Sequence, residues 1–142
     1  MTDSSAGSPH GIPQFQLKEI RKLADQYVSK SIGELIADID GHVTSAAAAK
    51  LEYPMVNVPL ATLIGERLKA ALAQWDSLND PQQFWLLGAI GYFVASDDEE
   101  DDFRSPIGFE DDAEVFNACI RFADHEQLVI TCLLYTSDAA DE

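Results

Sequence analysis

The segment Pro81-Gln-Gln-Phe-Trp-Leu-Leu-Gly-Ala-Ile-Gly-Tyr-Phe-Val-Ala95 decides the fold, because twelve consecutive apolar residues begin at Phe84. A helix without a polar face is either buried on every side or in contact with a membrane. A membrane-spanning helix needs about 20 residues. The segment therefore predicts a buried central helix, over about Pro81–Ala95, in a bundle. Gly88 and Gly91 would let a neighbouring helix approach it closely.

The residues just before this segment carry the signals of a helix start. Asp80 can serve as the N-cap, and Pro81 suits the first helical position, where its missing N–H leaves no hydrogen bond unmade. Gln83 can reach back to the N-cap as in a capping box. The sequence thus predicts that the helix starts at about Asp80.

An amphipathic helical pattern extends from Gln14 to Ile39. Its apolar residues recur every three or four positions, while most of the charged residues lie off that stripe. Ser31 and Gly33 are the places where so long a segment would bend or split. Gly41 follows the last apolar position and is expected to end the helix.

Two further helices are expected around the central one. One begins at Pro59 and carries its apolar residues on one face as far as Trp75. The other begins near Asp111, with Glu114 as its capping partner. The region His42–Val58 has no clear pattern, and no segment alternates with period two. The sequence therefore predicts an all-α fold, a small bundle of four or five helices.

Both ends of the chain fall outside the expected domain. Residues 1–13 are rich in Ser, Gly and Pro, which is typical of a flexible leader. Residues 132–142 resemble the in-frame translation of a sequencing adapter from a metagenomic read. We therefore expect one helical domain over residues 14–131 and a non-native tail. Cys119 is then the single native cysteine, which allows neither a disulfide nor a thiolate metal cluster.

The chain is strongly acidic, with 25 acids, nine bases and a formal net charge of −16. Nucleic acid and anionic lipid both attract basic surfaces, so this charge argues against nucleic-acid binding and membrane association. The first thirteen residues lack the apolar core of a secretory signal, and no run is long enough for a transmembrane segment. We expect a cytoplasmic protein.

The acids gather in one region. Ten of them lie between Asp97 and Glu114, and Arg104 is the one base among them. Such crowding raises carboxylate pKa values and lowers stability unless solvent, a helix N-terminus, a basic partner or a divalent cation offsets the repulsion. Residues 97–112, hereafter the acidic segment, are therefore the first place to look for function.

The same region resembles the YkvA-like family, a bacterial domain of unknown function. The family signature consists of a tyrosine, Ser-Pro-x-Asp, Pro-Asp-Phe-x-Pro, a glycine and an Asp-Asp pair. The residues that match it without a gap are Tyr92, Asp98, Asp102, Phe103, Gly108, Asp111 and Asp112. The resemblance implies a small helical domain and carries no established activity.

The chain departs from the family pattern within the acidic segment and beside it. Polar residues replace three family prolines, at Ser96, Asp101 and Ser105. Acids replace family apolar residues at Asp97, Glu99 and Glu100. Some members of the family look membrane-associated, but so acidic a segment does not enter lipid. We expect no membrane role for this chain.

Two functional hypotheses explain the acidic segment. In the favoured one, it is the interaction surface of a non-enzymatic protein and docks on a basic protein partner, with charge complementarity speeding association. In the alternative, Asp98, Asp102, Asp111 and Asp112 converge on Mg²⁺ or Ca²⁺, which would allow metal-dependent activity. A purely structural reading also stands, in which Asp111 caps the last helix and Asp112 and Glu114 interact with its dipole.

The remaining reactive residues favour a non-enzymatic protein over an enzyme. His10 lies in the leader, His42 in an expected loop after Gly41, and His125 near the end of the domain. None of them has the spacing of a zinc or di-iron site. Cys119 falls on an apolar stripe, where a core thiol is expected rather than a nucleophile.

Overall fold

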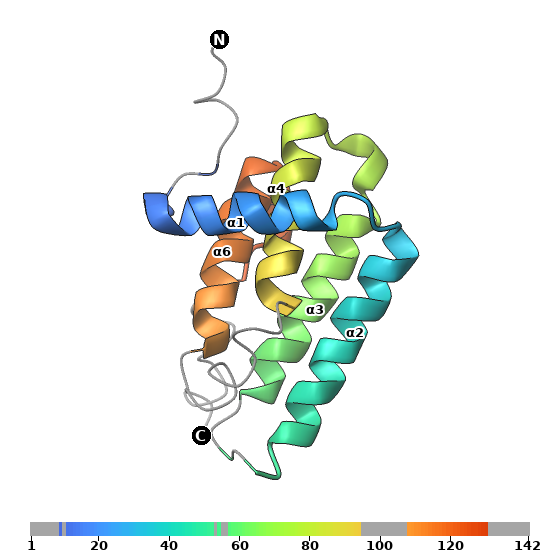
Figure 1. The fold of residues 1–142 in the computed structure, drawn as a ribbon, viewed down its shortest axis with the longest axis vertical. Helices are drawn as coiled ribbons and strands as arrows, with labels where there is room; N and C mark the ends of the chain where they lie inside the picture. The colour runs from blue at the N-terminus through green and yellow to red at the C-terminus, as the bar shows by residue number, and fades with distance from the viewer. Residues whose placement is uncertain (1–8, 10, 53, 55–56, 95–107, 131–142) are drawn as a thin grey trace.

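The chain folds as a small all-α bundle (Figure 1). The computed structural model describes residues 9, 11–52, 54, 57–94 and 108–130, with only the backbone of residues 108–111. Most of the predicted leader, residues 95–107 and the predicted tail lie outside this description. No strand occurs in the described ranges, so the predicted fold class is confirmed.

The helices are α1 Gln14–Tyr27, α2 Ile32–Ala49, α3 Val58–Leu72, α4 Asp80–Val94 and α6 Gly108–Phe122, with short 3-10 turns η2 Trp75–Ser77 and η4 Glu126–Leu128.

Helix α4 is the central helix, as its apolar sequence predicts. It contacts α1, α2 and α6. Trp85, Ile90 and Phe93 are almost completely buried, and they project from different sides of the helix. Figure 1 shows α1 lying across the bundle, while α2 and α3 lie side by side. A helix with no polar face is thus covered by neighbours on several sides.

The two glycines of α4 allow α1 to cross it at close range. A Cβ atom at Gly88 would lie 2.8 Å from the backbone oxygen of Ile20, and one at Gly91 would lie 3.0 Å from Cβ of Leu23. Carbon atoms do not approach a backbone oxygen that closely without displacing it. The prediction that these glycines admit a neighbouring helix is confirmed.

The long N-terminal pattern splits at Ser31, as predicted, but Gly41 does not end the second helix. The Ser31 hydroxyl accepts a hydrogen bond from the Glu34 amide at 3.1 Å, and the Glu34 carboxylate accepts one from the Ser31 amide at 2.8 Å. This capping box starts α2. The helix continues through Gly41 to Ala49, because His42 and Ala46 face the interior and pack there. Burial of these residues outweighs the intrinsic helix cost of glycine, about 1 kcal/mol.

Helix α3 begins one residue before its predicted start, and the cap of α4 lies one residue before its predicted place. Helix α3 begins at Val58, and the Asn57 side chain accepts from the Leu60 amide at 3.1 Å. At α4 the cap is Asn79 rather than Asp80, and its reciprocal partner is Gln82 rather than Gln83, with both hydrogen bonds at 2.9 Å. Pro81 still fits, because every amide in the first turn lacks an intrahelical partner.

Helix α6 begins at Gly108, three residues before its predicted start. Asp111 therefore lies inside the first turn and is not the N-cap, so this prediction is wrong. The inner face of the helix includes Phe116, Cys119 and Ile120, all buried. Asn117 exchanges two hydrogen bonds with the backbone of Ile130, which holds the chain after α6 against the bundle.

Candidate functional site

The acidic segment joins two helices that pack on each other. It follows α4, which ends at Val94, and its last five residues form the start of α6. Helices α4 and α6 are in contact, so the two anchor points belong to one packed unit. Tyr92, the first residue of the family signature, is partly buried, and its hydroxyl accepts a hydrogen bond from Nε2 of Gln16 at 3.1 Å. This bond ties the end of α4 to α1.

The described part of the chain contains only some of the predicted site residues. Asp98, Asp102 and Phe103 lie outside the described residues. Gly108 is the first residue of α6, and the structure describes Asp111 by its backbone alone. Within the described residues, no three His, Cys, Asp or Glu side chains gather in a metal-binding arrangement. The four-aspartate cation site thus stays a prediction.

Asp112 differs from the other described acids because its side chain is buried. It is only 4 % exposed, whereas Glu114, two residues further along α6, is exposed. The first turns of a helix favour negative charge through the helix dipole. Removing a carboxylate from water is costly unless polar groups or a cation compensate it. Asp112 is therefore part of the interior of the fold rather than of its solvated surface.

A second group of polar residues forms a hollow that the sequence analysis missed. The polar hollow has a volume of about 370 Å³ and opens beside the end of α4. Its described lining comprises Tyr27, Lys30, Asp38, Gly41, His42, Ser45 and Val94. Asp38, His42 and Ser45 follow one another at helical spacing along α2, so they share a face. The expected helix stop at Gly41 concealed this spacing.

The charged and aromatic side chains that line the polar hollow interact with one another. Nζ of Lys30 lies 3.1 Å from a carboxylate oxygen of Asp38 and 5.4 Å from the centre of the Tyr27 ring. Burial raises the pKa of the Tyr27 phenol, and the Asp38 carboxylate raises it further. The hydrogen bond to Asp38 raises the pKa of Lys30. At neutral pH the hollow therefore presents a neutral phenol and an ammonium group beside a carboxylate.

His42 lies at the inner side of this hollow and not in a loop, which corrects its predicted position. The residue is 5 % exposed, and its ring meets the ring of Phe93 edge to face, with 4.8 Å between the ring centres. The histidine therefore connects the hollow to the core side chains of α4. Its place in α2 follows from the same continuation of the helix past Gly41.

Cys119 is a core thiol, as predicted. It is 1 % exposed, and burial raises its pKa to about 12. A thiol is nucleophilic as its thiolate, so Cys119 in the folded protein does not have the chemistry of a catalytic cysteine. His125 lies at the surface near η4, with Nδ1 3.2 Å from Nε2 of Gln127, and His10 is outside the described residues.

Comparisons of the chain with protein-family models, with curated proteins and with solved structures find no match. Among the described helices, none is long and apolar enough to cross a membrane.

Proposed function

We propose that this chain is a YkvA-like, bacterial cytoplasmic protein without enzymatic activity, and that its acidic segment is a docking surface for a basic protein partner. The observation that carries the proposal is the concentration of acidic residues in one segment of the chain, next to helices that pack on each other. Ten acids and one base lie between Asp97 and Glu114 in a chain of nine bases. The helices on either side of them are in contact with each other.

The chemistry of such a segment favours a protein partner. Clustered carboxylates repel one another, and a basic surface relieves that repulsion when it binds. Electrostatic complementarity speeds encounter and selects partners of the opposite charge. The burial of Asp112 supports the proposal, because it ties one end of the acidic segment to the interior of the bundle. A docking segment with a fixed end loses less conformational freedom on binding.

The test is a titration with a fluorescent ten-lysine peptide, followed by fluorescence anisotropy at 50 mM and 500 mM salt. One variant neutralises four acids of the segment, Asp97→Asn, Asp98→Asn, Asp101→Asn and Asp102→Asn. The matched control neutralises four exposed acids elsewhere, Glu52→Gln, Glu66→Gln, Asp76→Asn and Asp124→Asn. We expect the segment variant to weaken binding at least tenfold and the control to change it less than threefold. Equal effects would mean that only net charge matters, and the proposal would fail.

A second candidate is a divalent-cation site formed by Asp98, Asp102, Asp111 and Asp112. The concentration of carboxylates in the sequence favours it, since Mg²⁺ and Ca²⁺ prefer carboxylate oxygens as ligands. Calorimetric titration with Mg²⁺, Ca²⁺ and Mn²⁺ tests it, with Asp111→Asn and Asp112→Asn as site variants and Glu114→Gln as the control. One-to-one binding that both site variants abolish would establish the site. If none of the three cations shows saturable binding, the proposed cation site is wrong.

A further inference from the structure

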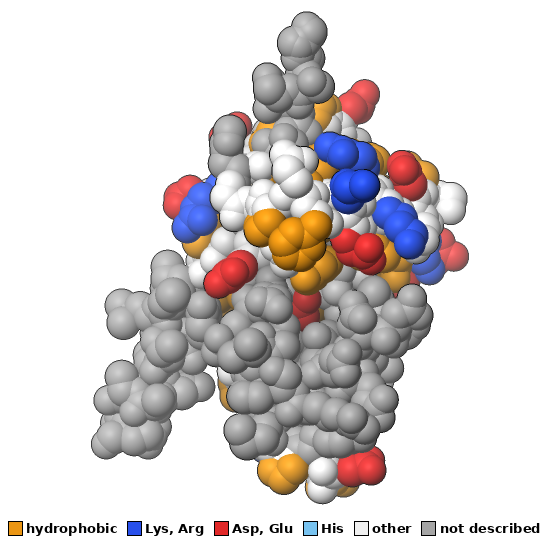
Figure 2. Space-filling model, turned by 60° about the vertical axis from the view of Figure 1, so that its left-hand side comes forward, with side chains coloured by type: hydrophobic (Ala, Val, Ile, Leu, Met, Phe, Trp, Pro, Cys, Tyr) orange, Lys and Arg blue, Asp and Glu red, His pale blue; other side chains and the backbone are white. Residues whose placement is uncertain are grey.

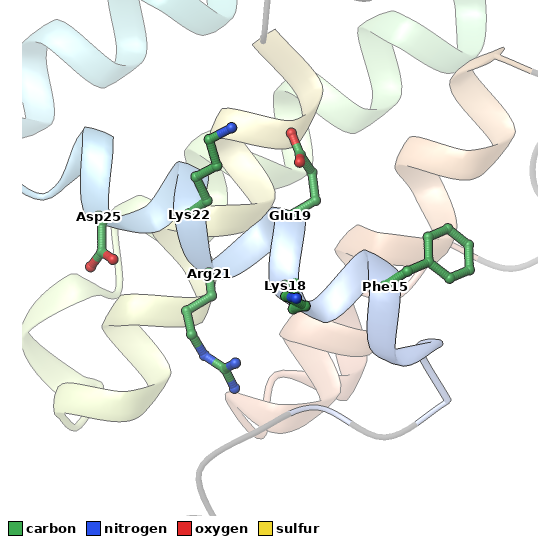
Figure 3. Close-up of a pocket in the computed structure, with 6 residues that line it drawn as sticks. All are labelled: Phe15, Lys18, Glu19, Arg21, Lys22 and Asp25. Carbon is green, nitrogen blue, oxygen red and sulfur yellow. The ribbon is translucent and has the colours of Figure 1, made fainter.

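A hollow larger than the polar hollow, of about 610 Å³, lies along the outward side of α1. Its described lining comes from this one helix and comprises Phe15, Lys18, Glu19, Arg21, Lys22 and Asp25. Figure 3 shows these side chains spread along the helix, with Phe15 near one end and Asp25 near the other. Figure 2 shows hydrophobic, basic and acidic side chains close together on this part of the surface. A small molecule needs walls on several sides, which the described lining of this hollow does not provide.

The polar hollow, in contrast, has walls from three parts of the bundle. Tyr27 is the last residue of α1, Lys30 lies in the turn before α2, and Val94 is the last residue of α4. The rest of its described lining lies along α2 and comprises Asp38, Gly41, His42 and Ser45. Its volume of about 370 Å³ falls in the range of about 300–1,000 Å³ that is typical of small-molecule sites.

Packing holds the walls of the polar hollow in place. A Cβ atom at Gly91 would lie 3.2 Å from Cδ1 of Tyr27, so the tyrosine ring rests against the backbone of α4. The His42 ring packs edge to face against an aromatic ring of the same helix. The capping box of Ser31 and Glu34 fixes the start of α2. Because these walls are already formed, a ligand loses less free energy to conformational ordering when it binds.

The ion pair in the polar hollow balances one positive charge against one negative charge. Nζ of Lys30 lies 3.1 Å from Oδ2 of Asp38, and each of the two side chains is 36 % exposed. The carboxylate repels a ligand with a net negative charge, and the ammonium group repels one with a net positive charge. An uncharged ligand meets neither repulsion and can use both groups as strong hydrogen-bond partners.

Two hydroxyl groups add donors and acceptors beside this ion pair. Ser45 is exposed and Tyr27 is partly buried, and each hydroxyl can both donate and accept a hydrogen bond. Because burial raises the pKa of the Tyr27 phenol, this group keeps its proton at neutral pH. The hollow therefore offers a mixture of donors and acceptors, which suits a ligand with several hydroxyl groups.

Adjacent hydroxyl groups fit the ion pair itself. The Lys30 ammonium group can donate to the oxygen of one hydroxyl, while the Asp38 carboxylate accepts from its neighbour. The ion pair stays intact, because both groups have more donors or acceptor sites than their mutual contact uses. Val94 supplies an apolar surface for the C–H groups of a ring. We propose that the polar hollow binds a small uncharged polyol of the monosaccharide class, which goes beyond the proposed function.

Two-dimensional ¹H–¹⁵N NMR of the full chain tests the inference, because it reports on the backbone amides that line the hollow. The probes are glucose, galactose, ribose and myo-inositol. We expect at least one of them to shift the amide signals of Lys30, Gly41 and Ser45 saturably. If none of the four does so, the inference is wrong. Glycine and inorganic phosphate are the charged probes, and tighter binding of either than of every polyol would also overturn the inference.

A substitution that fills the hollow provides the second measurement. Gly41→Leu adds a side chain at a position where no atom lies within 4 Å of the new Cβ. Gly33→Leu is the matched control, because it adds the same side chain to the same helix outside the described lining, with Oγ of Ser31 at 3.9 Å as the nearest atom. We expect Gly41→Leu to weaken binding of the best polyol at least tenfold and Gly33→Leu to change it less than twofold. Equal effects would contradict a site in the hollow.

The role of the ion pair has its own test. Asp38→Ala removes the carboxylate that pairs with Lys30, and Asp40→Ala removes one that pairs with Lys69 on the same helix, outside the described lining. We expect Asp38→Ala to weaken binding of the best polyol at least fivefold and Asp40→Ala to leave it within twofold. Unchanged or tighter binding in Asp38→Ala would show that the carboxylate does not hold the ligand, and the inference would fail.

Discussion

Helices α1 and α4 are nearly equal in length and cross each other, yet they have opposite roles. Eight of the 15 residues of α4 are buried, including both glycines at the crossing, whereas four of the 14 residues of α1 are buried. Helix α4 has no polar side and is enclosed by its neighbours. Helix α1 buries one stripe and presents charges on the other. Buried packing is therefore concentrated in α4 and its contacts, whereas the outward side of α1 carries exposed charged residues.

The largest expected effect tests the difference between the two sides of α1. Ile20 is completely buried against Gly88, so Ile20→Ala should lower the free energy of unfolding by about 2–5 kcal/mol through lost burial and a cavity. Phe15→Ala, on the exposed side, should change it by less than about 0.5 kcal/mol. Urea unfolding measures both. Similar losses in the two variants would mean that α1 does not have distinct inner and outer faces.

The next effect concerns the crossing itself. Gly88→Ala forces a methyl group against the Ile20 carbonyl and should destabilise the protein by about 1–3 kcal/mol. Gly41→Ala is the control, because no atom lies within 4 Å of the added Cβ in α2. There the better helix propensity of alanine should stabilise the fold by about 0.5–1 kcal/mol. The opposite signs distinguish a packing glycine from a tolerated one, and a stabilising Gly88→Ala would refute the close crossing.

Alkaline pH probes the interior that α4 shares with α6. The pKa of Cys119 is raised from 9.0 to about 12 in the folded state, so its contribution to stability is complete below pH 9 and is lost as the pH rises toward 12. In a Cys132→Ser background, unfolding should cost about 1.4 kcal/mol less at pH 10 than at pH 8 from this group alone. The control Cys119→Ala should show a correspondingly shallower pH dependence. If the free energy of unfolding depends on pH equally in both proteins, the Cys119 thiol does not lie in the core.

The smallest effect concerns the boundary between α1 and α2. Ser31→Ala removes the hydroxyl that accepts from the Glu34 amide and should cost about 1 kcal/mol. Ser29→Ala, just outside the cap, should have almost no effect on the urea midpoint. If both variants lower the urea midpoint equally, the Ser31–Glu34 capping box does not stabilise the start of α2.

Several features of the fold could be predicted because their causes are local in the sequence. The apolar run from Phe84 identifies the central helix, since no face of it could remain in water. The spacing of Gly88 and Gly91 indicates that a neighbouring helix approaches closely. Ser31 followed three residues later by Glu34 is a capping-box pattern, which depends only on neighbouring residues in the sequence. The core position of Cys119 follows from its place on an apolar stripe. The acidic segment is likewise visible in the sequence as a concentration of charge.

Other features depended on partners that are distant in the chain. Gly41 resembles a helix stop, but the helix continues because His42 and Ala46 find buried positions against the rest of the bundle. The polar hollow joins Tyr27 and Lys30 to Asp38 and Val94, and no local pattern relates these residues. The outward direction of Phe15, Lys18 and Lys22 was set by which stripe of α1 met α4. Sequence periodicity determined the helices and their apolar faces, whereas side-chain packing between helices decided the crossing and which side chains stay exposed.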